Sequence, residues 1–294
     1  MKHAYLIMAH NEPELLRLLL RRLDHKDNTI YLHCDSKFPG DPEDLGALLQ
    51  ASSFHSLRRR NCRWGHYSLV QVELELLKAA VADGHDYYHL LSGTDLPIRS
   101  HEEIDAFFQA HSGVEFVSLD KVANETRNFT ARYDRWHFRL PLPPGGKVRR
   151  LLTKAVNLPL LALEKVCDLL AGHRSRKFPD VTFMKGSQFF DITHDLAAYV
   201  VEQEPFVKKA FRFTALCDEV FLQTVACRSP YADRLASFNI RYIDWHRHGK
   251  SPEILTPAHY EDMMRSGRLY ARKFSSTQSK ELIEMLYGIP FPPR

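Results

Sequence analysis

The 294-residue chain lacks the patterns that would place it in several common classes. Its five cysteines form no C-x-x-C pair, which argues against a disulfide framework or a zinc site and fits a reducing compartment. No stretch reaches the ~18–20 apolar residues that a membrane-spanning helix needs. The apolar run at 4–9 is too short for a signal-peptide core. We therefore expect a cytoplasmic protein, with contact to a membrane only at its inner face.

Two further absences concern the ligand. The net charge of +4 is too small for a nucleic-acid-binding arm, and it favours local basic patches for anionic ligands. The sequence has no D-x-D motif, with which many enzymes hold a divalent metal beside a nucleotide diphosphate. His246 and His248 have no third ligand at a recognisable spacing, so we expect no metal requirement. Positive side chains must then balance any diphosphate.

Short apolar runs alternate with amphipathic stretches over the first 120 residues. This alternation predicts a mostly parallel sheet with helices on both faces, and in such sheets ligands lie beyond the carboxyl ends of the strands. The predicted strands are 4–9, 29–33, 54–57, 87–91 and 114–118, and the predicted helices are 13–23, 42–50, 68–82 (capped by Ser68) and 101–110 (capped by Ser100).

The rest of the chain changes character twice. An aromatic and basic stretch at 132–140 and a Pro/Gly breaker at 141–146 precede the segment 147–177, which carries eight Lys/Arg against two acids. Pro159 is expected to kink or split any helix there. Alternation then returns, with strands predicted at 181–184, 188–191 and 239–243, and helices at 193–202, 217–227 and 278–287.

Glu219 is the candidate general base. It follows Cys217 and Asp218 at the start of a predicted helix, where the helix dipole stabilises a carboxylate. A carboxylate in that position can accept a hydroxyl proton if its pKa is suitable. The alternative is an acid that serves only the helix start.

Basic residues near the C-terminus are candidates for binding a diphosphate. Arg272 and Lys273 are adjacent, and Lys250 ends the run from 245 to 250. Arginine grips phosphate with two parallel hydrogen bonds, whereas lysine acts as a point charge. The alternative for all three is solvated surface charge.

The remaining candidates line a pocket for two ligands. His10 and Asp35 follow the first two strands, where a nucleotide would lie, and Asp95, in the shaped loop 92–98, is a candidate for binding the acceptor. Trp245, together with the cluster that contains Arg132 and Tyr133, offers aromatic faces and donors for a sugar acceptor. The alternative is loop polarity for His10 and Asp35, turn structure for the loop 92–98, and a buried aromatic core for Trp245 and the cluster.

The order of these motifs resembles the core-2/I-branching β-1,6-N-acetylglucosaminyltransferase family, which includes the peptide O-xylosyltransferases. The resemblance covers nearly the whole chain. It is carried by residues 5–10 (YLIMAH), 31–37 (YLHCDSK), 64–71, 88–99 (YHLLSGTDLPIR), 186–190 (GSQFF), 218–219, 241–245 (RYIDW) and 271–274 (ARKF).

The resemblance implies a single GT-A domain with a Rossmann-like sheet and inverting sugar transfer from a UDP-sugar without an essential metal. Glu219 would be the base and Lys273 the diphosphate-binding lysine. Arg272 or Lys250 would be its basic partner, depending on the branch of the family. Asp35 would contact the nucleotide and Trp245 the acceptor. We divide the domain into a nucleotide-sugar part (1–125), a basic insertion (126–180) and a catalytic and acceptor part (181–294).

The anchor, stem and disulfide set of the animal enzymes are not found here, so we expect a bacterial member whose acceptor is a glycan or lipid-linked glycan. UDP-GlcNAc is the expected donor, and UDP-xylose is the alternative. A non-catalytic glycan- or nucleotide-binding module is the alternative of another class. The basic, leucine-rich segment 147–177 predicts peripheral membrane contact, with a solvated helix as its alternative.

Overall fold

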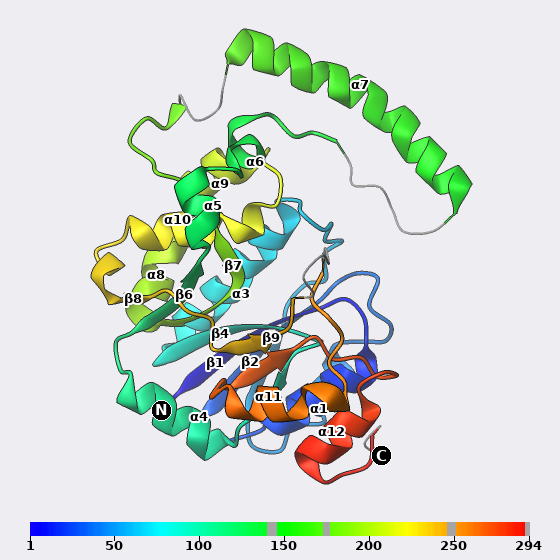
Figure 1. The fold of residues 1–294 in the computed structure, drawn as a ribbon, viewed down its shortest axis with the longest axis vertical. Coiled ribbons are helices and arrows are strands. Elements are labelled where there is room, and N and C mark those ends of the chain that lie inside the picture. Colours follow the sequence, from blue (N-terminus) through cyan, green and yellow to red (C-terminus); the bar gives the residue numbers. More distant parts are fainter. Residues whose placement is uncertain (140–145, 173–176, 246–250, 292–294) are drawn as a thin grey trace.

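A seven-stranded sheet forms the centre of the protein, as a computed structural model shows for residues 1–139, 146–172, 177–245 and 251–291 (Figure 1). Its strand order is β3-β2-β1-β4-β7-β6-β8. The strands are β1 (His3–Ala9), β2 (Asn28–Cys34), β3 (Ser53–Ser56), β4 (Tyr87–Ser92), β6 (Glu115–Leu119), β7 (Gly186–Thr193) and β8 (Leu235–Ala236).

The first four strands in this order pair in parallel, and β7 alone runs antiparallel to its two neighbours. A smaller sheet follows the order β5-β10-β9. It consists of β5 (Leu96–Pro97), β10 (Tyr270–Arg272) and β9 (Arg241–Ile243). The predicted fold class, a mostly parallel Rossmann-like sheet with flanking helices in a single domain, is confirmed.

Helices cover both faces of the large sheet, and each face has its own apolar core. One core draws on α3, α8, α9 and α10, and the other on α1, α4, α11 and α12. Both cores combine residues from 1–125 with residues from 181–294, so these two parts fold as one unit. The helices are α1 (Pro13–Leu23), α2 (Glu43–Gly46), α3 (Ser68–Asp83), α4 (His101–Ala110), α5 (Lys121–Thr126), α6 (Thr130–Asp134), α7 (Lys147–Ala171), α8 (His194–Glu202), α9 (Glu204–Phe211), α10 (Phe221–Cys227), α11 (Tyr260–Arg265) and α12 (Lys280–Tyr287).

Local signals predicted several elements well. Ser100 caps α4 in a capping box with Glu103, because each side chain hydrogen-bonds the other residue's backbone N–H. Ser68 is wrong as a cap: it is the first residue of α3, and its hydroxyl accepts the Arg63 N–H. The predicted helix at 42–50 shortens to α2, and 181–184 forms no strand.

Two other helices differ from the expectation. The predicted helix 217–227 divides into a 3-10 turn at Cys217–Glu219 and α10. Conversely, α7 runs through Pro159 without a break. Pro159 has no backbone N–H to donate, so the helix lacks one hydrogen bond to the Ala155 carbonyl. No helix among the described residues is long and apolar enough to cross a membrane.

A buried ion pair joins the two sheets. Asp191 of β7 accepts two hydrogen bonds from the Arg241 guanidinium of β9, at 2.6 and 3.1 Å, and both side chains are about 1% exposed. His89 lies 2.9 Å from the same carboxylate. Burial would raise the pKa of Asp191, but the charge of Arg241 and the His89 hydrogen bond hold it below its ordinary value.

Removal of one partner of this pair should destabilise the fold strongly. We expect Arg241→Met to lower the free energy of unfolding by about 3–5 kcal/mol, because the Asp191 carboxylate stays buried without its cation. The matched control is Arg234→Met, since Arg234 pairs with Asp195 on an exposed surface, where such a pair contributes about 0–1 kcal/mol. Urea denaturation measures both values. Equal effects of the two substitutions would contradict the assigned role.

Candidate functional site

Loops that follow β1, β2, β4 and β10 meet at the carboxyl edge of the large sheet. Asp35 N–H donates to the Ala9 carbonyl at 2.7 Å, which joins the first two loops. Phe274 N–H donates to the Thr94 carbonyl at 3.0 Å, which joins the loop after β10 to the loop after β4. His10 and Asp35, predicted for the nucleotide, and Arg272 and Lys273, predicted for the diphosphate, therefore lie at the same edge.

Asp35 lies where the sequence predicts, but its carboxylate is already engaged. The side chain is buried, and its two oxygens accept the backbone N–H groups of Lys37 (2.8 Å) and Cys62 (2.7 Å). Asp35 thereby holds the loop around residue 62 against the end of β2. These two hydrogen bonds shape the carboxyl edge of the sheet. The Lys37 ammonium lies 3.6 Å from the Asp35 carboxylate.

Arg272 is a buried cation with unused donors. Its guanidinium lies 4.1 Å from the centre of the Phe189 ring, and its Nη1 is 3.6 Å from the Asp95 carboxylate, beyond hydrogen-bond distance. Among the described residues, Nε and Nη1 have no hydrogen-bond partner. Burial lowers the pKa of Arg272, and Asp95 opposes that shift.

Asp95 differs from its predicted role at the acceptor. Its side chain is fully buried, and it accepts hydrogen bonds from the backbone N–H and the hydroxyl of Ser92. Its other neighbour is Arg272. The structure thus places Asp95 as the counter-ion that positions Arg272, without exposed surface for a glycan.

Lys273 and His10 are electrostatic neighbours at this edge. The pKa of His10 is lowered by the loss of surrounding water and then by the positive charge of Lys273, while Asp35 opposes the shift. His10 is therefore neutral at neutral pH. A neutral imidazole beside Arg272 and Lys273 can hydrogen-bond a nucleotide without adding charge.

Glu219 lies at the end of the 3-10 turn before α10. Its carboxylate is about one third exposed and contacts two cations: Arg132 Nη1 at 2.6 Å and Lys185 Nζ at 3.9 Å. Lys185 also pairs with Asp120 at 2.8 Å. The sequence analysis missed Lys185 and Asp120, because their pairing depends on the adjacency of β6 and β7 and leaves no local signal.

Strand β7 connects the Glu219 cluster to Arg272. Because β7 is antiparallel to β4, its first residue, Gly186, lies at the carboxyl edge of the parallel strands. Lys185 immediately precedes it, and Phe189, under the Arg272 guanidinium, follows four residues after Lys185. That spacing is roughly 13 Å along a strand. Glu219, the predicted base, and Arg272, a predicted diphosphate-binding residue, thus lie along the same edge.

Two buried acids lie behind Glu219. Burial raises the pKa of Asp218 to about 7, and the charge of Glu219 adds to the shift. Burial, followed by the charge of Asp218, raises the pKa of Glu73. Glu73 accepts a hydrogen bond from Gln188 at 2.6 Å, whereas Asp218 Oδ1 has no partner among the described residues. Asp218 and Glu73 are thus buried acids with raised pKa values, whereas Glu219 is partly exposed to solvent.

The proton on Asp218 predicts a pH-dependent stability. The native carboxyl keeps its proton up to about pH 7, whereas the unfolded one releases it near its ordinary pKa of 3.8. Rising pH therefore favours unfolding, by on the order of 2–3 kcal/mol between pH 5 and pH 8. Asp218→Asn should reduce the fall by this amount, as measured by urea denaturation at both pH values, while the raised pKa of Glu73 leaves a residual fall. Asp233→Asn, at an exposed site, should keep it; an unchanged pH dependence in Asp218→Asn would contradict the assignment.

The predicted acceptor residues separate in the structure. Tyr133 is a core residue: it stacks on Phe183 with 4.1 Å between ring centres, and its hydroxyl accepts a hydrogen bond from Arg127. The acceptor assignment of Tyr133 is therefore wrong, because the aromatic–basic cluster turns this ring inward. Arg132 faces Glu219. Trp245 is 58% exposed, and Lys250 lies outside the described residues.

A cavity of about 420 Å³ adjoins the segment that carries Arg132. His137, five residues after Arg132, donates its backbone N–H to Phe213. The chain from Phe213 then runs to Glu219. The lining has aromatic and basic side chains and no carboxylate: His66, Tyr67, Gln71, His137, Phe138, Lys208, Arg212 and Phe213.

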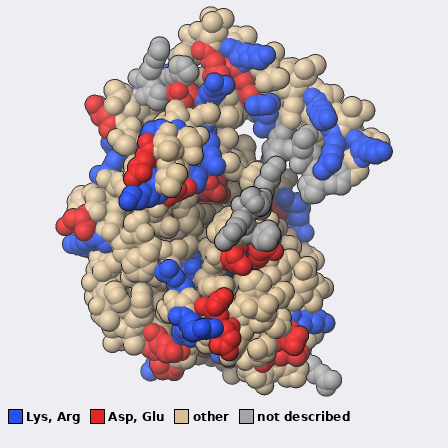
Figure 2. All heavy atoms as spheres, viewed as in Figure 1, with Lys and Arg blue, Asp and Glu red and all other residues tan. Residues whose placement is uncertain are grey.

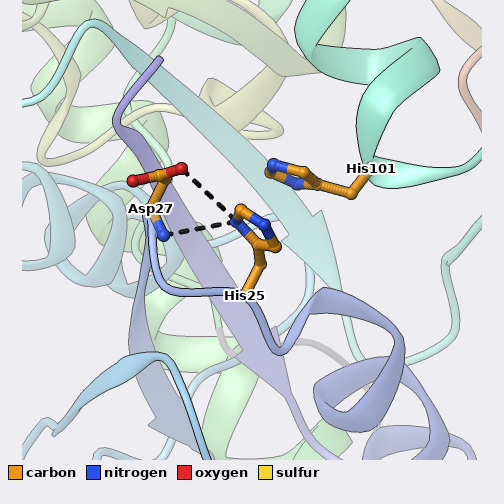
Figure 3. A group of neighbouring side chains, drawn as sticks. All are labelled: His25, Asp27 and His101. Atoms are coloured by element: carbon orange, nitrogen blue, oxygen red, sulfur yellow. Dashed lines mark hydrogen bonds and ion pairs between the residues drawn. The ribbon is translucent and has the colours of Figure 1, made fainter.

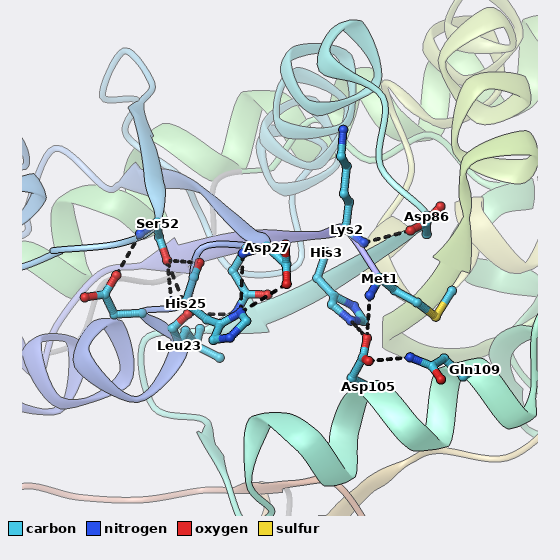
Figure 4. Close-up of polar contacts among 12 residues, drawn as sticks. Met1, Lys2, His3, Leu23, His25, Asp27, Ser52, Asp86, Asp105 and Gln109 are labelled. Atoms are coloured by element: carbon cyan, nitrogen blue, oxygen red, sulfur yellow. Dashed lines mark hydrogen bonds and ion pairs between the residues drawn. The ribbon is translucent and has the colours of Figure 1, made fainter.

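Among the described residues, one group has the ligand types for a metal ion: His25, Asp27 and His101 (Figure 3). The two imidazole rings are stacked, with 3.6 Å between centres and 24° between planes, and one ligand atom from each of the three residues lies within 4.8 Å of the others. Asp27 pairs with His25 at 3.6 Å. Figure 4 shows the neighbouring contacts, in which Ser52 Oγ accepts the His25 N–H.

This histidine group lies at the opposite end of β2 from the candidate site. His25 and Asp27 immediately precede β2, whereas Asp35 follows it, so the length of β2, about 20 Å, separates the two edges.

Residues 3–264 match the family model named Branch, the Core-2/I-Branching enzyme. The chain belongs to that family. It is similar to xylosyltransferase 2 of Rattus norvegicus and of Homo sapiens, at 26% identity over 99% of this chain. It is also similar to xylosyltransferase 1 of Rattus norvegicus, at 22% identity over 96% of this chain. The chain spans about one third of the length of these relatives, 34% and 35% respectively.

Proposed function

We propose that this protein is a bacterial GT-A glycosyltransferase that transfers a sugar from a UDP-sugar to a hydroxyl of a glycan, with inversion and without a metal. One observation carries the proposal: the buried Arg272 guanidinium offers unpaired donors at the edge that also holds Lys273 and His10. A diphosphate supplies the acceptor oxygens that such donors need. The acceptor belongs to surface polysaccharide or glycoconjugate synthesis at the inner face of the membrane.

The mechanism uses one base and one cationic clamp. Glu219 accepts the proton of the acceptor hydroxyl as that oxygen attacks the anomeric carbon. Arg132 and Lys185 contact this carboxylate and fix its position. The bond between the anomeric carbon and the diphosphate breaks on the opposite side, and Arg272 and Lys273 stabilise the departing negative charge. A single displacement from the opposite side inverts the anomeric configuration.

The cavity beside Phe138 and Phe213 is the proposed acceptor subsite. Aromatic rings stack on the apolar faces of sugars, and His66, Gln71 and His137 supply hydrogen-bonding groups. Lys208 and Arg212 favour a glycan that carries negative charge. In this proposal the cavity and the exposed Trp245 bind the acceptor, in place of the buried Tyr133 that the sequence suggested.

Glu219→Gln tests the base. We expect turnover to fall by about 10²–10⁴-fold, the usual contribution of a general base, while UDP binding stays within twofold. Glu202→Gln changes an exposed acid at the end of α8 and should retain full activity. Initial rates of UDP release with acceptor present, together with UDP titration calorimetry, give both readouts. Full activity of Glu219→Gln would refute the base assignment. No turnover by the wild type with any UDP-sugar would favour a binding module.

Arg272→Gln tests the diphosphate clamp. The loss of charged hydrogen bonds worth about 1.5–3 kcal/mol should weaken UDP binding by roughly 10–100-fold. Arg265→Gln, at a 72% exposed position on α11, should bind UDP normally.

Wild-type activity should also survive EDTA. Activity that disappears with EDTA and returns with a divalent ion would overturn metal independence.

The donor sugar is a separate element of the proposal. UDP-GlcNAc is the proposed donor, and UDP-xylose is the second candidate because the similar proteins are named xylosyltransferases. Hydrolysis rates measured across a panel of UDP-sugars distinguish the two. Faster hydrolysis of UDP-xylose would reassign the donor and leave the roles of Glu219 and Arg272 intact.

A further inference from the structure

Helix α7 exposes an apolar stripe along its full length. At 3.6 residues per turn, or about 100° per residue, the exposed apolar side chains fall within an arc of roughly 160° on one face. Their exposed fractions range from 46% to 83%, for Val148, Leu151, Leu152, Val156, Leu158, Leu163, Val166, Leu169 and Leu170. A continuous apolar face of this size marks an interaction site.

The stripe points away from the attached segment of the protein. The opposite side of α7 carries its two acids, and both bind the segment 136–139. Glu164 is buried and accepts the backbone N–H groups of Phe138 and Arg139, at 2.8 and 3.0 Å. Asp168 accepts the Trp136 N–H at 3.3 Å. Figure 1 shows α7 as an arm at the top of the molecule, away from the sheet.

Charge distinguishes between partners for this face. Lys147, Lys154 and Lys165 lie in a row along one flank of the stripe, roughly 100° from its centre. Neither acid of α7 lies on the exposed face. Figure 2 shows both Lys/Arg and Asp/Glu side chains on this arm, with uncharged surface between them. A second copy would oppose like charges, whereas an anionic surface would neutralise them.

We propose that α7 lies in the plane of an anionic phospholipid membrane, with its apolar stripe among the acyl chains and its lysine row at the headgroups. The helix is about 37 Å long, and it has too many charges to cross the bilayer. The segment that anchors α7 continues back to Arg132, the partner of Glu219. Membrane contact would therefore bring the base close to an acceptor held at the same surface.

Vesicle co-sedimentation tests this inference without donor or acceptor, so its result is independent of transferase activity. Wild-type protein should pellet with vesicles of phosphatidylglycerol and phosphatidylcholine, and at least about tenfold less with phosphatidylcholine alone. The double substitution Leu152→Glu and Val166→Glu places charges in the stripe at exposed positions, so it should abolish pelleting without unfolding the protein. Its matched control, Val122→Glu with Met285→Glu, changes exposed apolar residues on α5 and α12 and should pellet like the wild type.

Two outcomes would overturn the inference. One is equal recovery of the wild type in the supernatant with and without anionic vesicles. The other is a concentration-dependent dimer, measured by light scattering, that the stripe substitution dissociates, because a second copy would then cover α7. Circular dichroism of the double variant confirms that lost pelleting does not reflect lost structure.

Discussion

The buried pair between Asp191 and Arg241 is the interaction on which the site depends. It joins the large sheet to the three-stranded sheet, and Arg241 also donates to the Leu90 carbonyl of β4. The next strand in the small sheet is β10, in register with β9, and it ends at Arg272. The position of Arg272 over Phe189 therefore depends on the buried pair between Asp191 and Arg241.

Three carboxyl groups of the candidate site differ in role because their surroundings differ. Glu219 is partly exposed and lies between two cations, whereas Asp218 turns inward, where burial raises its pKa to about 7. Asp95 is fully buried but lies beside Arg272. Glu219 is thus the carboxylate that we propose as the base, and Asp218 and Asp95 stabilise the structure around it.

The segment from residue 132 to residue 139 connects chemistry with surface contact. At one end, Arg132 binds the proposed base, and at the other end Glu164 anchors α7. The same segment forms a wall of the cavity proposed for the acceptor. Family membership supports the proposed glycosyl transfer, and this arrangement is the basis for the proposed approach of the acceptor.

The sequence by itself determined the alternating elements of the first 120 residues, the α4 cap at Ser100 and the ordered motifs that contain Glu219 and Arg272. These features depend on local periodicity, capping chemistry and residue order. Only the tertiary structure decided that Tyr133 is core, that Lys185 reaches Glu219 and that the stripe of α7 faces outward. Those outcomes depend on which distant elements pack together, because burial and charge pairing are set by neighbours that lie far away in the chain.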